Sequence, residues 1–239
     1  MTQIGKEPSY SYWQLFGLFK KCPYSYYLGY EMHLKSQAPK GKMERATVEG
    51  AMYHKAMELK VKSKWSWEEM YQNFYLVVAQ AMQEFPEASN RRIQKAGKEV
   101  LNLLKSNEKG RFVEYIDGLK KAEVTIKGYY KGKKLKGRID GLGVIENPDK
   151  KIFSVDWKLQ ESASSQGSHQ LAFYNLILPL NESWVYYPKQ DLPKPVRLSE
   201  TRLEKIGETV LEIIDQIESG NRQKNYKSCF YCSYKIYCR

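Results

Sequence analysis

The sequence lacks the patterns that would place the protein in or across a membrane. None of its apolar runs approaches the roughly 18–20 residues that a membrane-spanning helix needs. The N-terminal stretch MTQIGKEPSYSYWQ has no apolar core of the kind found in signal peptides. Internal repeats and low-complexity tracts are also missing, and 42% of the 239 residues are hydrophobic, which is normal for a chain that buries a core. We therefore expect a folded cytoplasmic protein that makes no contact with membranes.

Acidic residues are scarce relative to basic ones. The chain has 39 Lys and Arg against 27 Asp and Glu, a formal net charge of +12. The imbalance is strongest from Lys120 to Arg138, where eight basic residues accompany one acid, Glu123. The 19 tyrosines add aromatic surface, and aromatic side chains beside cations suit single-stranded nucleic acid. The composition favours a polyanionic partner such as DNA, although a solvated lysine-rich surface would produce the same charge.

Cysteine is also rare, and its four copies are unevenly spaced. Cys229, Cys232 and Cys238 form a C-x2-C-x5-C run, whereas Cys22 lies near the N-terminus and precedes a proline. In a reducing compartment such a set is more typical of a metal site than of disulfides. Four thiolates suit either a [4Fe–4S] cluster or a structural zinc ion. Zinc sites more often contain two C-x-x-C pairs and one is missing here, so the arrangement favours the cluster over zinc, with disulfides third.

The hydrophobic pattern changes along the chain from helical spacing to alternation. We expect helices first, at 9–31 (broken near Cys22), 45–62, 66–84 and 91–106. Strands follow at 122–130, 135–145 and 151–160, then a helix at 169–178, a strand at 183–188 and a helix from Ser199 to about Gly220. This order predicts an α/β fold with a mixed central β-sheet flanked by helices, in a single domain spanning 1–239. Its expected parts are an N-terminal segment (1–44), a helical region (45–108), a sheet core (109–198) and a C-terminal helix with a three-cysteine tail (199–239).

Two acids and a lysine stand out on the predicted strands. Asp140 ends the stretch GRID, and Asp156 and Lys158 lie in FSVDWKLQ, where side chains two residues apart share a face. If the two strands pair across the turn NPDK, the three side chains meet at one end of the sheet. A divalent ion, usually Mg²⁺ or Mn²⁺, would remove the repulsion between two close carboxylates, and Lys158 would act on water or phosphate beside it. A buried salt bridge between Lys158 and one Asp would explain the same pattern, and these three residues alone slightly favour it.

Further motifs give this pattern a resemblance to a known family. GRID followed by DWK resembles the signature of PD-(D/E)XK nucleases. The stretches GAMYH (50–54) and QLAFY (170–174) resemble the G-x-x-x-H and Q-x-x-x-Y motifs of the RecB-like branch. KKCPYSYYLGY and the late CFYCSYKIYC resemble the iron–sulfur staple of AddB-type nucleases and of the related CRISPR-associated four-cysteine exonucleases. The matches follow the family's order from about residue 9 to Cys238.

The resemblance implies a RecB-like nuclease core and a role for each matching residue. His54, Asp140, Asp156 and the backbone carbonyl of Trp157 would hold Mg²⁺ or Mn²⁺. Lys158 would be the catalytic lysine. Two features depart from the family's pattern here. No proline precedes the first acid, Asp140, and the acid of the third motif, Asp156, is Asp rather than Glu.

The resemblance also implies supporting residues and a second cofactor. Gln170 and Tyr174, one helical turn apart, would support the catalytic site and contact DNA. Leu159 and Gln160 replace the small residues often found after the lysine, which puts the shape of the adjoining loop in doubt. A [4Fe–4S] cluster would join the N- and C-terminal segments through Cys22, Cys229, Cys232 and Cys238.

The function implied by the resemblance is a metal-dependent DNA exonuclease. It would hydrolyse phosphodiester bonds, chiefly at single-stranded ends and from the 5′ side, with some internal cutting. Such enzymes serve CRISPR adaptation, recombination and repair, or phage replication, where protein partners and oligomers are expected. The alternatives are a non-catalytic or partner-dependent iron–sulfur subunit that only binds DNA, and a nuclease whose staple holds zinc.

Overall fold

A mixed sheet forms the centre of the computed structural model, which describes residues 7–36, 42–146, 150–160, 165–227 and 232–238. The sheet has six strands in the order β1-β3-β4-β5-β6, and β2 pairs with β3 beside this path. The strands are β1 (Tyr10–Ser11), β2 (Leu119–Tyr130), β3 (Lys133–Ile145), β4 (Lys151–Trp157), β5 (Glu182–Tyr187) and β6 (Leu192–Pro195). The pairs β1–β3 and β4–β5 are parallel, and the other pairs are antiparallel. The predicted α/β fold with a mixed central sheet is confirmed.

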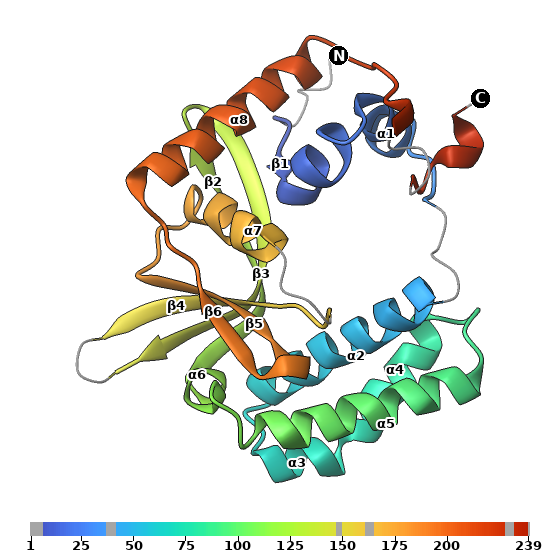
Figure 1. The fold of residues 1–239 in the computed structure, drawn as a ribbon, viewed down its shortest axis with the longest axis vertical. Helices are drawn as coiled ribbons and strands as arrows, with labels where there is room; N and C mark the ends of the chain where they lie inside the picture. Colours follow the sequence, from blue (N-terminus) through green and yellow to red (C-terminus); the bar gives the residue numbers. More distant parts are fainter. Residues whose placement is uncertain (1–6, 37–41, 147–149, 161–164, 228–231, 239) are drawn as a thin grey trace, which may run out of the picture.

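Helices cover the sheet on both faces (Figure 1). On one side lie the N-terminal segments η1 (Trp13–Phe19), α1 (Pro23–Tyr26) and η2 (Tyr27–Glu31), together with α7 (Ser165–Asn175) and α8 (Glu200–Glu218). On the other side lie α2 (Lys42–Lys62), α3 (Trp67–Gln72), α4 (Phe74–Glu84), α5 (Asn90–Asn107) and α6 (Val113–Asp117). Two short turns of helix, η3 (Pro188–Gln190) and η5 (Lys235–Tyr237), complete the described elements. None of the helices in the described ranges is long and apolar enough to span a membrane.

Two hydrophobic cores lie on opposite faces of the sheet. The first packs Leu135 and Ile139 of β3 against the N-terminal segment, α7 and α8. The second packs Phe153, Val155 and Trp157 of β4 against α2 to α6. Because side chains alternate along a strand, the residues between these three on β4 face the first core. From Phe153 to Trp157, both faces of β4 are therefore kept away from water.

Several local signals in the sequence determine where elements begin and turn. The β2–β3 hairpin turns at Lys131 and Gly132, both with positive φ (44° and 79°), the backbone that twists with the strands it joins. Ser66 caps α3 through a reciprocal pair of hydrogen bonds with Glu69. The side chain of Ser199 accepts a hydrogen bond at the start of α8, at the predicted position.

Several expectations about the elements were wrong in detail. The helical region predicted from residue 9 is preceded by strand β1 at Tyr10 and Ser11. The helix predicted for 66–84 is two helices, α3 and α4, that meet at Asn73. Helix α7 begins at Ser165 rather than His169. Helix α6 and the edge strand β6 were not predicted, the latter because its two prolines, Pro193 and Pro195, argue against a strand except at a sheet edge.

Asn107 is a buried side chain that ties together three elements. Its Oδ1 accepts a hydrogen bond from the Tyr53 hydroxyl (3.1 Å), and its Nδ2 donates to the carbonyl oxygen of Pro188 (3.1 Å). Asn107→Leu would leave the Tyr53 hydroxyl without this buried partner and would remove one of the two hydrogen bonds to the Pro188 carbonyl, which also accepts from the Asp191 N–H. We therefore expect it to lower the free energy of unfolding by about 1–3 kcal/mol. Urea denaturation measures this, with the exposed Asn102→Leu on the same helix as the matched control. Equal losses for the two variants would contradict the prediction.

Candidate active site

Asp156 is a carboxylate buried in the middle of the sheet. Its neighbours Val155 and Trp157 face the second core, so Asp156 points to the opposite face, where only 1% of the residue is exposed. The Nζ atom of Lys158 lies 2.7 Å from Asp156 Oδ2. No aligned hydrogen bond from the described residues reaches either carboxylate oxygen, so this contact is an ion pair. Burial, together with the nearby Asp140 carboxylate, raises the pKa of Asp156 to about 7.

Asp140 reaches the same place from the neighbouring strand. Gly141 pairs with Val155, which places Asp140 beside the end of β4. The backbone N–H of Trp157 donates a hydrogen bond to Asp140 Oδ2 (2.9 Å) and fixes the carboxylate there. The strand register therefore brings Asp140, Asp156 and Lys158 together at one end of the sheet.

His54 approaches these acids from helix α2. Its Nδ1 lies 3.7 Å from Asp140 Oδ2 and 3.4 Å from Glu123 Oε1. Burial alone would lower the pKa of His54, but the carboxylates of Asp140 and Glu123 outweigh it and raise the pKa. The carboxylates around the imidazole thus favour a positive charge at this position.

Glu123 belongs to the site but was not predicted. It lies on β2 between the pairs Ala122–Gly141 and Val124–Ile139, with a positive φ of 53°. The ligand atoms of His54, Glu123 and Asp140 all lie within 4.8 Å of one another, and Glu123 Oε2 also contacts Arg138 Nε at 2.8 Å. Its position as the one acid in a run of eight basic residues was the signal that could have identified it.

Lys158 is connected to the helix that follows the sheet core. Its Nζ donates to Gln170 Oε1 (3.4 Å), and Gln170 Nε2 donates to the Tyr174 hydroxyl oxygen (2.8 Å). The ring of Tyr174 lies over Gly137, where a Cβ would come within 2.5 Å of it. Burial disfavours the ammonium of Lys158, but the carboxylates of Asp156 and Asp140 offset this and raise its pKa. The lysine therefore stays charged, and its position is fixed from two sides.

The donor set fits a divalent metal ion. Within the described residues, the buried Asp156 carboxylate makes no aligned hydrogen bond and contacts the Lys158 ammonium. Next to it, possible ligand atoms of His54, Glu123 and Asp140 lie within 4.8 Å of one another, in a group that does not include Asp156. Oxygen and imidazole ligands suit Mg²⁺ and Mn²⁺. A cation would also reduce the repulsion that raises the pKa of Asp156. The structure does not test the expected role of the Trp157 carbonyl, which stays a prediction.

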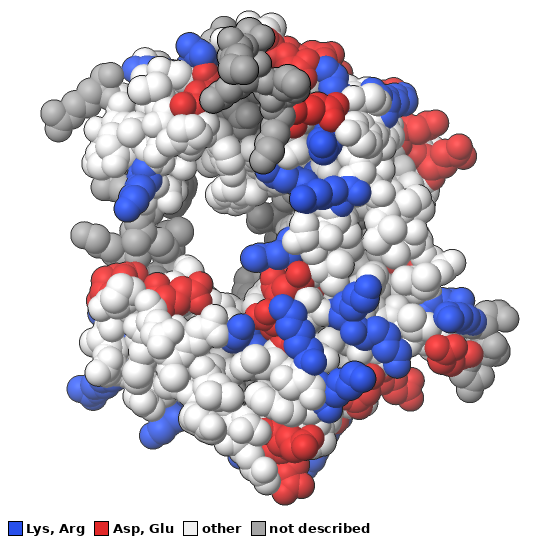
Figure 2. Space-filling view, turned by 180° about the vertical axis from the view of Figure 1, so that it is seen from behind, with Lys and Arg blue, Asp and Glu red and all other residues white. Residues whose placement is uncertain are grey.

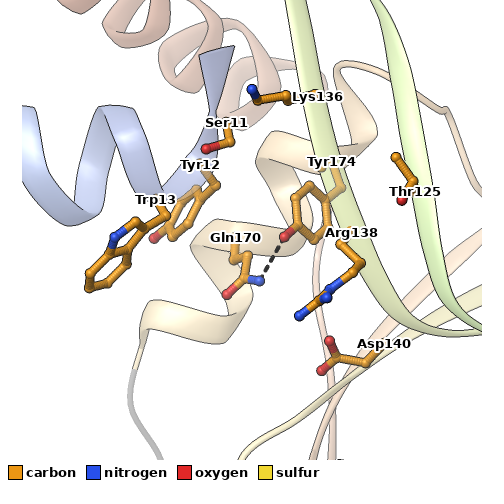
Figure 3. Close-up of a pocket in the computed structure, with 10 residues that line it drawn as sticks. Ser11, Tyr12, Trp13, Thr125, Lys136, Arg138, Asp140, Gln170 and Tyr174 are labelled. Atoms are coloured by element: carbon orange, nitrogen blue, oxygen red, sulfur yellow. Dashed lines mark hydrogen bonds between the residues drawn. The ribbon is translucent and has the colours of Figure 1, made fainter. Parts of the chain in front are cut away.

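A cleft of about 360 Å³ opens at Asp140 and extends to the N-terminal segment (Figure 3). Its lining comprises Ser11, Tyr12, Trp13, Thr125, Lys136, Gly137, Arg138, Asp140, Gln170 and Tyr174. Aromatic rings stand on one wall, and the basic side chains of Lys136 and Arg138 come from β3 on the other. Figure 2 shows Lys and Arg side chains on one side of a hollow in the middle of the molecule, with Asp and Glu side chains along its lower edge. This combination suits a polyanion that carries aromatic bases.

The two ends of the chain meet at a group of cysteines. Cys22, Cys232 and Cys238 line one small pocket, and Cys229 lies outside the described residues. The backbone N–H of Asn225 donates to Cys22 Sγ (3.4 Å), and the Asn225 side chain donates to the carbonyl oxygen of Lys21 (2.8 Å). The fold therefore places the N-terminal cysteine beside those of the C-terminal tail.

Comparison with known proteins gives a family and a similar fold. A family model described as the PD-(D/E)XK nuclease superfamily matches residues 14–239. A crystal structure from Eubacterium rectale, described as a candidate exonuclease, has a TM-score of 0.61 and 14% identity, covering 97% of this chain and 88% of its own. At that identity the likeness shows the fold alone. The structure of SSO0001 has 20% identity over 67% of this chain and 79% of its own, but its TM-score of 0.38 carries no weight. The comparison with curated proteins gives no match.

The raised pKa of Asp156 predicts a pH-dependent stability in the absence of metal. The carboxyl group has a pKa near 3.8 in the unfolded chain and near 7 in the fold. Its protonation therefore contributes stability that is fully present below pH 4 and is lost as the pH rises to about 7. Asp156→Asn removes this titration. As the pH rises across that range, we expect the free energy of unfolding of Asp156→Asn to rise by roughly 2–4 kcal/mol relative to that of the wild type.

Urea denaturation in EDTA across this pH range measures the difference. Added Mn²⁺ at the alkaline end should stabilise the wild type and leave Asp156→Asn unchanged. Parallel stability curves for the two proteins would show that Asp156 ionises normally in the fold.

Proposed function

Because the chain belongs to the PD-(D/E)XK nuclease superfamily, we propose that it is a divalent-metal-dependent DNA exonuclease acting chiefly on single-stranded ends, from 5′ to 3′. The observation that carries the proposal is the ion pair of Asp156 and Lys158 next to Asp140, which lines a basic, aromatic cleft. The description of the Eubacterium rectale protein as a candidate exonuclease agrees with it. The polarity rests on the family resemblance. CRISPR adaptation, recombination and repair, or phage replication are the processes that such an enzyme would serve.

The metal would be held by Asp140, Asp156 and His54, with the Trp157 carbonyl as a further ligand. His54 and Asp140 share a group of close ligand atoms with Glu123 rather than with Asp156, so Glu123 is a further candidate ligand. When bound, Mg²⁺ or Mn²⁺ would activate water and offset negative charge on the scissile phosphate. Asp156 would contribute a buried carboxylate whose contact among the described residues is the ion pair with Lys158. Asp140 is oriented for the same purpose by the Trp157 backbone N–H.

The remaining residues hold and stabilise the phosphate. Lys158 stays protonated, so its ammonium would stabilise the charge that develops on the phosphate oxygens in the transition state. Gln170 holds the lysine through its side-chain carbonyl, and Tyr174 holds the amide of Gln170. Lys136 and Arg138 lie along the cleft, where they would bind neighbouring phosphates of the strand.

The cysteines are proposed to bind a [4Fe–4S] cluster that fastens the two chain ends together. Support comes from the shared pocket of Cys22, Cys232 and Cys238 and from the hydrogen bond that Asn225 donates to Cys22 Sγ. Backbone donors to cysteine sulfur are a common way of tuning such clusters. Four thiolates would also suit zinc, and the metal content of the purified protein distinguishes the two.

Anaerobically purified protein should degrade end-labelled single-stranded DNA with Mg²⁺ or Mn²⁺ and not with EDTA. Lys158→Ala should lower the rate by at least about 100-fold, because it removes a charge that acts on the transition state. Asp140→Ala and Asp156→Ala should abolish cleavage, and DNA binding should persist in all three. Lys151→Ala, at the exposed start of the strand that leads to Lys158, is the matched control. Normal cleavage by Lys158→Ala would refute the role of the lysine, and binding without cleavage by the wild type would indicate a subunit that only binds DNA.

Replacing a cysteine should reduce soluble yield and cluster content before it affects the chemistry. In Cys22→Ser and Cys232→Ser we expect loss of the broad visible absorbance and of iron and sulfide, because a cluster needs all four thiolates. Ser233→Ala, next to Cys232, serves as the control. A soluble and fully active Cys232→Ser protein without iron would contradict the staple.

A further inference from the structure

Trp13 is a large apolar side chain that the fold leaves exposed. It is 51% exposed, the highest value among the five tryptophans of the chain, all of which are described. It lines the same cleft as Asp140, on the wall opposite Lys136 and Arg138 (Figure 3). Because exposure of an indole has a cost and its position faces the active-site cleft, Trp13 has the features of a binding residue.

The backbone around Trp13 holds the ring in place. Trp13 begins the π-helical segment η1, a geometry that occurs frequently at functional sites. Its indole lies across Gly17, where any Cβ would collide with the ring, so the glycine makes room for it. Lys21 Nζ lies 5.8 Å from the ring centroid. The result is a supported aromatic surface with a cation beside it.

Trp13 also belongs to the lining of a second cleft. This cleft has a volume of about 400 Å³, and its lining includes Trp13, Lys21, Cys22, Lys227 and Cys232. Trp13 is thus shared by a cleft that leads to the active site and one that leads to the cysteines. Both clefts carry basic side chains near the indole.

We propose that Trp13 is a base-stacking platform for single-stranded DNA, and that the strand continues from the active-site cleft over Trp13 into the second cleft. Lys21 and Lys227 would bind its phosphates there. A paired base has its faces covered by its neighbours in the duplex, so stacking on Trp13 selects a single strand. This inference rests on the proposed function, because it names the residue that recognises the substrate.

The test is binding of oligothymidylate in EDTA, where no cleavage interferes. Loss of one base–aromatic stack should raise the dissociation constant of Trp13→Ala roughly 5- to 150-fold, whereas Trp13→Phe should retain most of the affinity. Tyr75→Ala is the matched control, because Tyr75 is 64% exposed on α4 and lines neither cleft. Tryptophan fluorescence of the wild type should be quenched on binding, and most of this quenching should vanish in Trp13→Phe.

Oligonucleotides with one abasic site locate the stacked base. At one position the abasic site should weaken binding to wild type as much as Trp13→Ala does, and it should have no further effect on Trp13→Ala. Equal affinity of Trp13→Ala and wild type, with normal cleavage by wild type, would overturn this inference and leave the proposed function intact. If Trp13→Ala binds more weakly but the wild type cleaves no DNA, the proposed nuclease activity is refuted. The role of Trp13 in binding single-stranded DNA is then supported.

Discussion

The ion pair between Asp156 and Lys158 is the interaction around which the site is built. In water, such a pair contributes little, because solvent screens both charges. On β4 the carboxylate is almost fully buried, since Val155 and Trp157 seal one face of the strand and the first core covers the other. Removing a carboxylate and an ammonium from water costs several kcal/mol per ion unless other groups compensate. Asp140 adds a like charge to this environment, so the protein alone compensates incompletely, and the proposed divalent cation would complete the site.

The surrounding backbone is shaped to bring side chains close to this pair. A Cβ at Gly167 would come within 2.9 Å of Asp156 Oδ2, and Gly137 leaves room for the ring of Tyr174. These two glycines let α7 and β3 approach the site closely. Glu123 has a left-handed backbone, which costs on the order of 1–2 kcal/mol for a residue with a side chain. In return, its carboxylate lies beside His54 and Asp140, so this strain is located where the charges meet.

The sequence was sufficient to predict those features that depend on spacing along one element. The alternation of β4 places Asp156 and Lys158 on one face, and the four-residue spacing on α7 places Gln170 against Tyr174, as their hydrogen bond shows. Features that depend on distant contacts were missed. Glu123 appears in the sequence as a minor exception in a basic run, and only the strand register brings it to His54. Trp13 was missed for the same reason, because its exposure depends on how the N-terminal segment packs against α7 and β3.

The position of Trp13 also bears on why the chain ends are joined next to the substrate path. The segment that carries Trp13 leads directly into Cys22, and hydrogen bonds from Asn225 tie Lys21 and Cys22 to the C-terminal tail. A short N-terminal segment packed at one edge of a sheet would otherwise fray, since termini are commonly the least stable part of a fold. A cluster at the cysteines would thus hold the indole in register with the active-site cleft. On this view the proposed cluster would act on substrate binding through geometry alone, with no role in electron transfer.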